Sequence, residues 1–229
     1  MITVDYVVVE TYIDVVPTPL RLFDASAESA TEAMQAAADS AIAAASIGTE
    51  HYHAGRFLEA ESAYREAIEL VPDFEIAHLN LGIVLYAQER LAESESELLQ
   101  AIRLDSTLKP FEAHFCLGVV LHQQGKFSEA ESVYHEALVH RPDHAVTQMG
   151  IGYTLCAQER YPEAESAFRA ALTLAPSEDS QAGLGLALQK QGMFYDAEVA
   201  WRVAISLNPN SARNLVGLGL VLLDQKKFA

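Results

Sequence analysis

The sequence has few basic residues, with 15 Lys and Arg against 32 Asp and Glu, so its net charge is -17 at pH 7. A protein that binds DNA or RNA neutralises phosphates with Lys and Arg, so this balance argues against nucleic acids and anionic membrane surfaces as partners. Cysteine is scarce as well, since only Cys116 and Cys156 occur in 229 residues. We expect no disulfide between them, and reduced thiols in a cytoplasmic protein are the simpler interpretation.

The sequence also lacks a segment suited to crossing a membrane. The N-terminal stretch MITVDYVVVETYIDVV is apolar but is interrupted by Asp5, Glu10 and Asp14. It is too short and too charged to span a bilayer, and a signal peptide needs a basic start and an unbroken apolar core. Its many β-branched residues are typical of a strand. We expect residues 1–24 to form an extended arm, which either folds onto the first repeat or pairs as a strand with another chain.

Glycine and proline are present at regular intervals that mark a repeated unit. The stretch from 111 to 144, FEAHFCLGVVLHQQGKFSEAESVYHEALVHRPDH, predicts two amphipathic helices joined at Gly125 and closed by Pro142. Gly125 suits the left-handed residue that ends a helix, and Pro142 cannot continue one. The same helix-turn-helix unit recurs with a period of about 34 residues, which indicates a helical-repeat solenoid.

The period divides most of the chain into copies of this unit. The predicted copies span 41–74, 75–108, 111–144, 145–177 and 178–211, with a half copy at 212–229. Before them, an Ala-rich run predicts a leader helix over 25–40, with Ser29 and Glu32 spaced as a capping box. Its apolar stripe continues into the first copy, so the two helices are either continuous or broken near Asp39 and Ser40. We expect the leader helix to cap the open end of the array.

Several positions recur in register from copy to copy. The first helix carries a small residue at Gly48, Gly82, Gly118, Gly152, Gly185 and Gly219. The second helix carries the large residue Tyr64, Leu98, Tyr134, Phe168 or Trp201, with a small residue before it and an alanine after it. This pattern resembles the tetratricopeptide repeat family over residues 41–229. The resemblance implies an all-α fold, a right-handed superhelical solenoid of about five and a half repeats in which each repeat packs on its neighbours.

Two turns depart from the pattern. Glu89 and Glu159 stand where Gly55, Gly125 and Gly192 join the helices of the other copies. A side chain in the left-handed conformation costs roughly 1 kcal/mol, so either the turn differs there or the strain is tolerated.

The last helix is also unusual, because it is too apolar to end an array. This predicts either a fragment of a longer chain or an apolar surface that drives association.

Paired carboxylates occur at the start of every predicted second helix. The pairs are Glu59 and Glu61, Glu93 and Glu95, Glu129 and Glu131, Glu163 and Glu165, and Asp196 and Glu198. Such pairs can act as acid and base in glycoside hydrolysis, but negative charge at a helix N-terminus also complements the helix dipole. Because the pairs recur in every copy, we expect a structural role on the outer surface. No nucleophile motif or phosphate-binding loop is found, so we predict no enzyme activity and no cofactor.

None of the eight histidines predicts a metal site. His51 and His53 are two residues apart and point to different sides of a helix, whereas zinc-binding helices use positions such as i and i+4. His78 and His114 hold equivalent positions in adjacent copies and can approach each other, but two ligands without a nearby Cys or carboxylate make a poor site.

The resemblance implies that first helices line a concave groove. The corresponding stripe of this sequence is mostly apolar and aromatic, which favours an amphipathic helix or an extended apolar peptide as partner. Any one of these side chains can instead pack between neighbouring first helices. The predicted peptide-binding residues are Thr49, Tyr52, Leu79, Asn80, Ile83, Tyr86, Phe115, Val119, His122, Met149, Tyr153, Leu186 and Gln189.

Tetratricopeptide arrays that bind acidic chaperone tails carry a clamp of Lys, Asn and Arg. Of the matching residues here only Asn80 fits, and Glu112 would repel a carboxylate. The sequence therefore predicts a scaffold or adaptor that binds another protein in its groove. One alternative is the substrate-recruiting region of a longer modular enzyme, such as a glycosyltransferase. Another is self-association through the N-terminal arm or the last helix.

Overall fold

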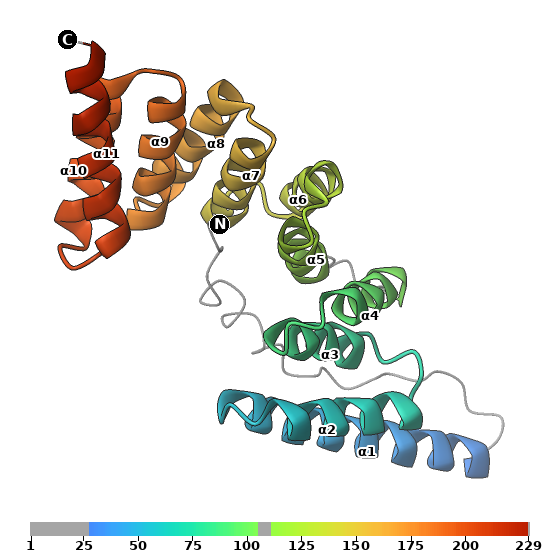
Figure 1. Cartoon of the computed structure of the whole chain (residues 1–229). Coiled ribbons are helices and arrows are strands. Elements are labelled where there is room, and N and C mark those ends of the chain that lie inside the picture. The colour runs from blue at the N-terminus through green and yellow to red at the C-terminus, as the bar shows by residue number, and fades with distance from the viewer. Residues whose placement is uncertain (1–27, 105–110, 229) are drawn as a thin grey trace. The chain divides into compact units, whose positions relative to one another are not determined.

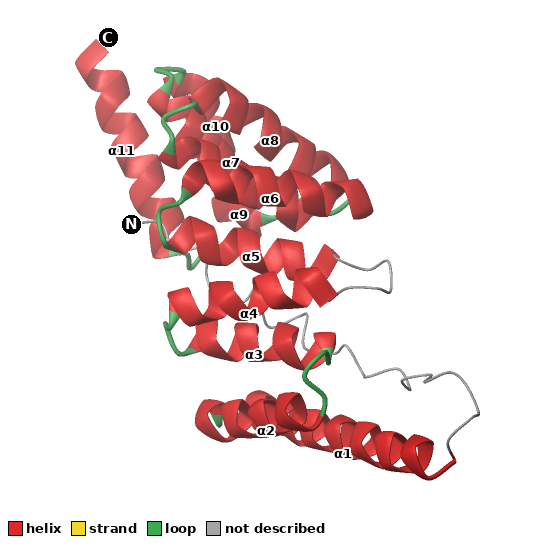
Figure 2. Ribbon diagram, turned by 90° about the vertical axis from the view of Figure 1, so that its right-hand side faces the viewer, coloured by secondary structure: helices red, strands yellow, loops and turns green. Residues whose placement is uncertain are grey.

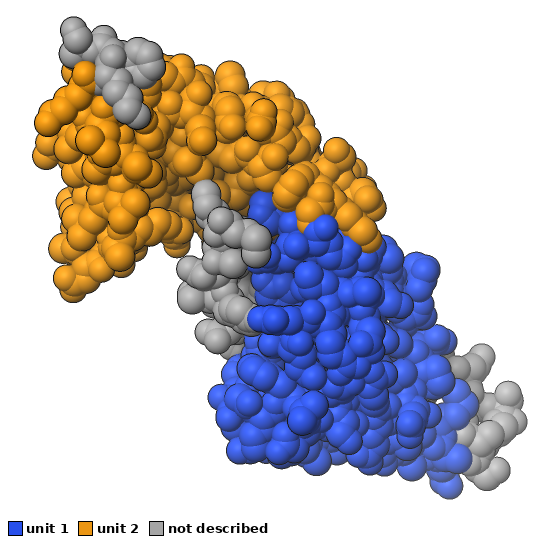
Figure 3. All heavy atoms as spheres, in the orientation of Figure 1, with its two compact units in different colours: residues 1–124 blue, residues 125–229 orange. Residues whose placement is uncertain are grey.

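A computed structural model describes residues 28–104 and 111–228, and in this part of the chain helices alternate with short turns and loops and there is no strand (Figures 1 and 2). The predicted arm over residues 1–24 lies outside the described residues. The chain divides into two compact units, residues 1–124 and 125–229 (Figure 3). Unit 1 holds α1 (Glu28–His53), α2 (Phe57–Leu70), α3 (Glu75–Ala87), α4 (Leu91–Leu104) and α5 (Phe111–Gln123). Unit 2 holds α6 (Phe127–His140), α7 (Ala145–Ala157), α8 (Tyr161–Leu174), α9 (Glu178–Lys190), α10 (Phe194–Leu207) and α11 (Ala212–Phe228).

The leader helix and the first helix of the first repeat form one continuous helix, α1, of 26 residues. There is no break at Asp39 or Ser40, and the Ser40 hydroxyl donates a hydrogen bond to the carbonyl of Ala36 one turn earlier. We call residues 28–40 the leader half of α1. Side chains 32–36 of this half are exposed, and burial begins near Ala38.

In four hairpins, α1–α2, α3–α4, α7–α8 and α9–α10, a glycine of the first helix lies close to a large side chain of the second. The Tyr64, Leu98 and Phe168 side chains are each completely buried. A Cβ atom added to Gly82 would lie 2.7 Å from Leu98, and one added to Gly152 would lie 2.7 Å from Phe168. Both distances are shorter than van der Waals contact, so a larger residue cannot be accommodated without movement.

The left-handed turns are present where the repeat pattern places them. Gly55, Gly125 and Gly192 have φ angles of 70°, 77° and 79°. Glu89 and Glu159 have φ angles of 61° and 60°, so the left-handed conformation is kept although both residues carry a side chain. The turn therefore does not differ at these two sites, and its strain is tolerated.

A ladder of Gln–Glu hydrogen bonds connects each repeat to the preceding one inside each unit. The donor is the side-chain N–H of the glutamine just before the left-handed turn residue, or of the glutamine at the matching position of α11. The acceptor is a glutamate of the second helix in the preceding repeat, the later member of its carboxylate pair. The pairs, with N···O distances of 2.7–3.0 Å, are Gln88–Glu61, Gln124–Glu95, Gln158–Glu131, Gln191–Glu165 and Gln225–Glu198. The first repeat has Ala54 at this position.

Two arginines strengthen this ladder in the second and fourth copies, whose turns, residues 87–90 and 157–160, both read Ala-Gln-Glu-Arg. Arg90 and Arg160 each place one guanidinium nitrogen 2.6 Å from the same carboxylate that accepts the glutamine bond. Burial alone would raise the pKa of Glu61, but hydrogen bonds from Gln88, Arg65 and Arg90 outweigh it and lower that pKa. The second member of each carboxylate pair is thus a structural acceptor.

We predict that Gly152→Ala lowers the free energy of unfolding by about 1–3 kcal/mol, because the new methyl group overlaps the Phe168 ring. Gly219→Ala is a matched control at the same repeat position, where an added Cβ meets no atom within 4 Å. Ala is the better helix former by about 1 kcal/mol, so this control should be neutral or stabilising. Urea unfolding followed by circular dichroism measures both, and equal effects of the two changes would contradict the packing argument.

We predict that Glu61→Gln costs about 1–2 kcal/mol of unfolding free energy at neutral pH, because the charge-assisted bonds to Arg90 and Arg65 are lost. The folded pKa of Glu61 is lowered from its ordinary value of 4.5. Its contribution is therefore present above that value and is lost as the pH falls through the folded pKa. Urea titrations at several pH values should show the cost of the change shrinking in acid. The exposed Glu59→Gln should cost little at any pH, and a similar cost at both positions would refute the ladder.

Candidate functional site

In unit 1, the predicted peptide-binding residues are largely covered. Thr49 of α1 is half-buried, and its hydroxyl lies 2.9 Å from the Tyr64 hydroxyl. The other eight are each at most 9% exposed: Tyr52, Leu79, Asn80, Ile83, Tyr86, Phe115, Val119 and His122. These residues lie on the first helix of each repeat in unit 1, namely α1, α3 and α5. Little of their surface is open to a partner.

In unit 2, the same stripe becomes progressively more open along the chain. Met149 and Tyr153 on α7 are each 6% exposed, whereas Leu186 and Gln189 on α9 are half-buried. On α11 the equivalent residues are exposed: Val216 by 61%, Leu220 by 51% and Leu223 by 56%. We call Leu186, Gln189, Val216, Leu220 and Leu223 the α9–α11 face.

The three α11 residues are absent from the set predicted from the sequence. They hold the repeat positions that Leu79, Ile83 and Tyr86 hold in the second copy, so the register alone indicates them. Their importance comes from exposure, which the repeat pattern does not predict.

Polar contacts flank the α9–α11 face. The Gln189 amide donates to the Asp224 carboxylate at 2.9 Å, which connects the C-terminal parts of α9 and α11. Arg213 pairs with Asp179 and connects their N-terminal parts. The Tyr153 hydroxyl donates to the Asp179 carbonyl at 2.9 Å, and burial raises the pKa of this hydroxyl above its ordinary range. The apolar residues therefore lie between two polar clusters, which suits an amphipathic ligand.

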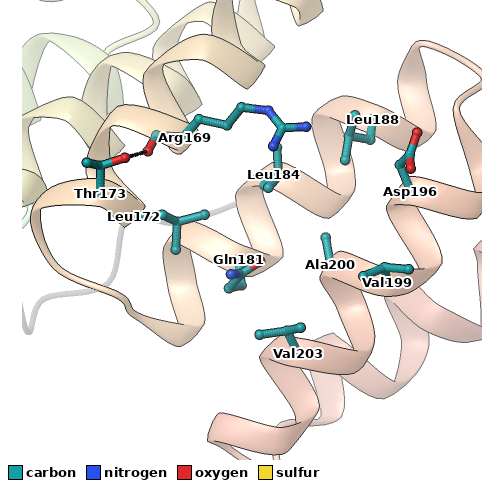
Figure 4. Close-up of a pocket in the computed structure, with 10 residues that line it drawn as sticks. All are labelled: Arg169, Leu172, Thr173, Gln181, Leu184, Leu188, Asp196, Val199, Ala200 and Val203. Atoms are coloured by element: carbon teal, nitrogen blue, oxygen red, sulfur yellow. Dashed lines mark hydrogen bonds between the residues drawn. The ribbon is translucent and has the colours of Figure 1, made fainter.

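A separate hollow of about 560 Å³ lies among α8, α9 and α10 (Figure 4). Leu184 and Leu188 of α9 and Val199 and Val203 of α10 supply apolar walls, while Arg169 of α8 stands at one side. Its polar lining residues are Arg169, Thr173, Gln181 and Asp196. The hollow thus combines apolar walls with four polar side chains.

The buried His78 and the half-buried His144 each have structural partners. His78 contacts the Glu97 carboxylate at 2.7 Å through Nδ1 and the Pro72 carbonyl at 2.9 Å through Nε2. Burial alone would lower the pKa of His78, but these two hydrogen bonds outweigh it and raise that pKa. His144 caps α7 by accepting from the Thr147 N–H, and burial with the nearby Arg141 charge lowers its pKa to about 4.

Within residues 28–104 and 111–228, no group of three or more His, Cys, Asp or Glu side chains is placed to hold a metal ion. In the same part of the chain, no helix combines the length and the hydropathy needed to cross a bilayer.

Solved structures share this fold at low sequence identity. YrrB, described as a tetratricopeptide protein with an unusual peptide-binding site, is 20% identical, with a TM-score of 0.66 over 83% of this chain and 97% of its own. MamA is 19% identical, with a TM-score of 0.66 over 73% of this chain and 97% of its own. A tetratricopeptide repeat protein from Parabacteroides merdae ATCC 43184 is 18% identical, with a TM-score of 0.72 over 82% of this chain and 75% of its own. No curated protein sequence matches the chain.

Two tetratricopeptide repeat family models match the sequence itself, one over residues 45–113 and the other over residues 110–177. Together they span residues 45–177, which is more than half of the 229 residues. The matched segments contain three of the four glycine and large-residue contacts, four of the five left-handed turns and three of the five Gln–Glu pairs described above. The chain therefore belongs to the tetratricopeptide repeat family.

Proposed function

We propose that the chain is a protein-interaction scaffold that binds the apolar side of a helix or extended peptide from another protein on the α9–α11 face. The observation that carries this proposal is the exposure of Val216, Leu220 and Leu223, each more than half open to solvent, on one stripe of α11. Exposed apolar side chains at helical spacing are a common form of docking surface for an amphipathic segment.

The flanking polar groups support a ligand with an apolar centre and polar ends. Asp179 with Arg213, and Gln189 with Asp224, lie at opposite ends of the apolar stripe. Such groups fix the register of a bound segment, while the apolar centre supplies most of its affinity.

Of the residues predicted from the sequence, Leu186 and Gln189 lie on this face. The predicted residues of α3 and α5 are buried, so the proposal does not depend on them. The structural neighbour YrrB is described as having an unusual peptide-binding site, which makes peptide recognition a reasonable use of this fold.

The proposal assigns no catalytic step to the chain. Tetratricopeptide proteins are mostly scaffolds, His78 and His144 have structural partners, and each paired carboxylate either accepts a hydrogen bond of the ladder or lies exposed. Both cysteines are free thiols, which fits the cytoplasmic setting we propose.

We predict that Leu186→Glu combined with Leu220→Glu removes partner binding without unfolding the chain. Partners would be captured from native lysate with the wild-type chain, and segments of a captured protein would then be titrated by fluorescence anisotropy. Burying two carboxylates against an apolar ligand should weaken binding at least about tenfold, a change of about 1.4 kcal/mol.

The matched control is Leu58→Glu combined with Val139→Glu, which changes two exposed apolar residues of second helices. This control should bind like the wild type. Equal binding by all three proteins, each shown to be folded by circular dichroism, would rule out the α9–α11 face as the docking surface.

A further inference from the structure

The hollow among α8, α9 and α10 lies inside the array, between two second helices (Figure 4). All of its lining residues fall between Arg169 and Val203, so it is formed by these three helices alone. Here α9 supplies the buried residues Leu184 and Leu188, and α10 supplies the exposed Val199. Its properties can therefore be compared with the equivalent places in the other copies of the repeat.

The second copy fills the equivalent place with a pair of polar side chains. His78 of α3 reaches Glu97 of α4, with 2.7 Å between Nδ1 and the carboxylate. The repeat register puts Gln181 of α9 and Ala200 of α10 at these two positions in the fifth copy. Ala200 has only a methyl group and cannot make this bond, so the space between the helices stays available to a ligand.

Two apolar residues of α10 that line the hollow depart from the repeat pattern. Val199 is 61% exposed and Val203 is 36% exposed. The other second helices carry Ser62, Ser96, Ser132 and Ser166 at the first position and Glu66, Gln100, Glu136 and Ala170 at the second. Because those helices pack without a valine at either position, the fold does not require the two valines. Exposed apolar side chains that gather at a hollow are typical of a docking surface.

The carboxylate of Asp196, which also lines the hollow, has lost the partner that its equivalents have. In the second copy Arg90 pairs with the equivalent Glu93 at 2.6 Å. A basic residue stands three positions before this carboxylate in each of the first four copies: Arg56, Arg90, Lys126 and Arg160. The fifth copy has Met193 there, so the exposed Asp196 lacks an equivalent ion pair.

We propose that this hollow binds a basic amphipathic helix of another protein. The apolar side of that helix covers Val199 and Val203, and one of its Lys or Arg side chains pairs with Asp196, as an arginine of the chain itself does in other copies. Asp196 and Val203 are seven residues apart on α10, about 10 Å at 1.5 Å per residue, which corresponds to two turns of a bound helix. Helices commonly dock in this way, with apolar anchors at successive turns laid into a groove.

Charge decides between another protein and a second copy of this chain. With a net charge of -17, two copies repel each other, whereas a basic partner is attracted by the whole chain as well as by Asp196. Arg169, the basic residue of the lining, pairs with Glu165 through its Nε at 2.9 Å, so its charge is already balanced.

This surface is separate from the one that the proposed function uses. The α9–α11 face includes Leu186 and Gln189 of α9, whereas the hollow uses Leu184 and Leu188 of the same helix. The two surfaces share no residue, so each can be changed without the other.

The probe is a phage-displayed library of randomised amphipathic helices, selected on the whole chain. The library is first depleted on Val199→Ser combined with Val203→Ala, a variant that places the residues of α8 at both positions and so keeps the repeat pattern. Helices that survive this depletion and bind the wild type should carry an apolar stripe with Lys or Arg at one end. The recovered helices are then made as synthetic peptides and titrated by fluorescence anisotropy.

The variants should separate the apolar contact from the charged one. Val199→Ser with Val203→Ala should weaken a recovered peptide at least about tenfold, because two apolar side chains of the contact are lost. Met193→Arg should weaken it about threefold, because the new arginine competes for Asp196 as Arg90 binds Glu93. Asp196→Asn should lower the affinity and remove most of its dependence on salt.

The matched control is Leu58→Ser combined with Val139→Ala, which changes two exposed apolar residues of other second helices. It should bind the recovered peptides like the wild type. Circular dichroism checks that every variant is folded before its affinity is compared.

Three results would overturn the inference. The first is that no helix survives the depletion and binds the wild type. The second is that the surviving helices lack basic residues or bind Met193→Arg as tightly as the wild type. The third is that Leu186→Glu with Leu220→Glu removes their binding, which would place them on the α9–α11 face and so support the proposed function while this inference fails.

Discussion

The contact between a glycine of a first helix and a large side chain of the following second helix, seen in four hairpins, is the constraint on which the rest of the structure depends. Because Gly82 has no Cβ, Leu98 can lie within van der Waals distance of the first helix, and the two helices close into a hairpin. The close approach also places the small residue Ser94 so that its hydroxyl donates to the Gly82 carbonyl at 2.6 Å. Each hairpin thereby becomes a unit of fixed thickness that can stack on the next.

Stacking then uses a second interaction, the hydrogen bond from a glutamine of one repeat to a carboxylate of the preceding one. A long apolar contact alone allows neighbouring hairpins to slide, whereas a directional bond such as Gln158–Glu131 at 2.8 Å defines their register. The high content of acidic residues is explained in part by this role. Half of the carboxylates in the repeated pairs accept these bonds, and most of the others lie exposed.

The exposure of α11 follows from the same packing rule. A first helix is apolar on the side that faces its second helix, so α11 exposes that side through Leu215 as well as the stripe with Leu220. The apolar stripe that is exposed on α11 is therefore buried at the equivalent positions of α3 and α5 in unit 1.

The sequence by itself determined the helices, their turns and the repeat family, because these depend on local signals. The spacing of apolar residues, the turn glycines and the recurrent Gly82 and Leu98 positions act within about 34 residues of one another. Even the strained turns at Glu89 and Glu159 were visible as departures from the pattern. Only the tertiary structure decided which residues of one equivalent stripe are accessible. Ile83 and Leu220 hold the same repeat position, yet one is 1% and the other 51% exposed, because burial depends on what packs over a residue from elsewhere in the chain.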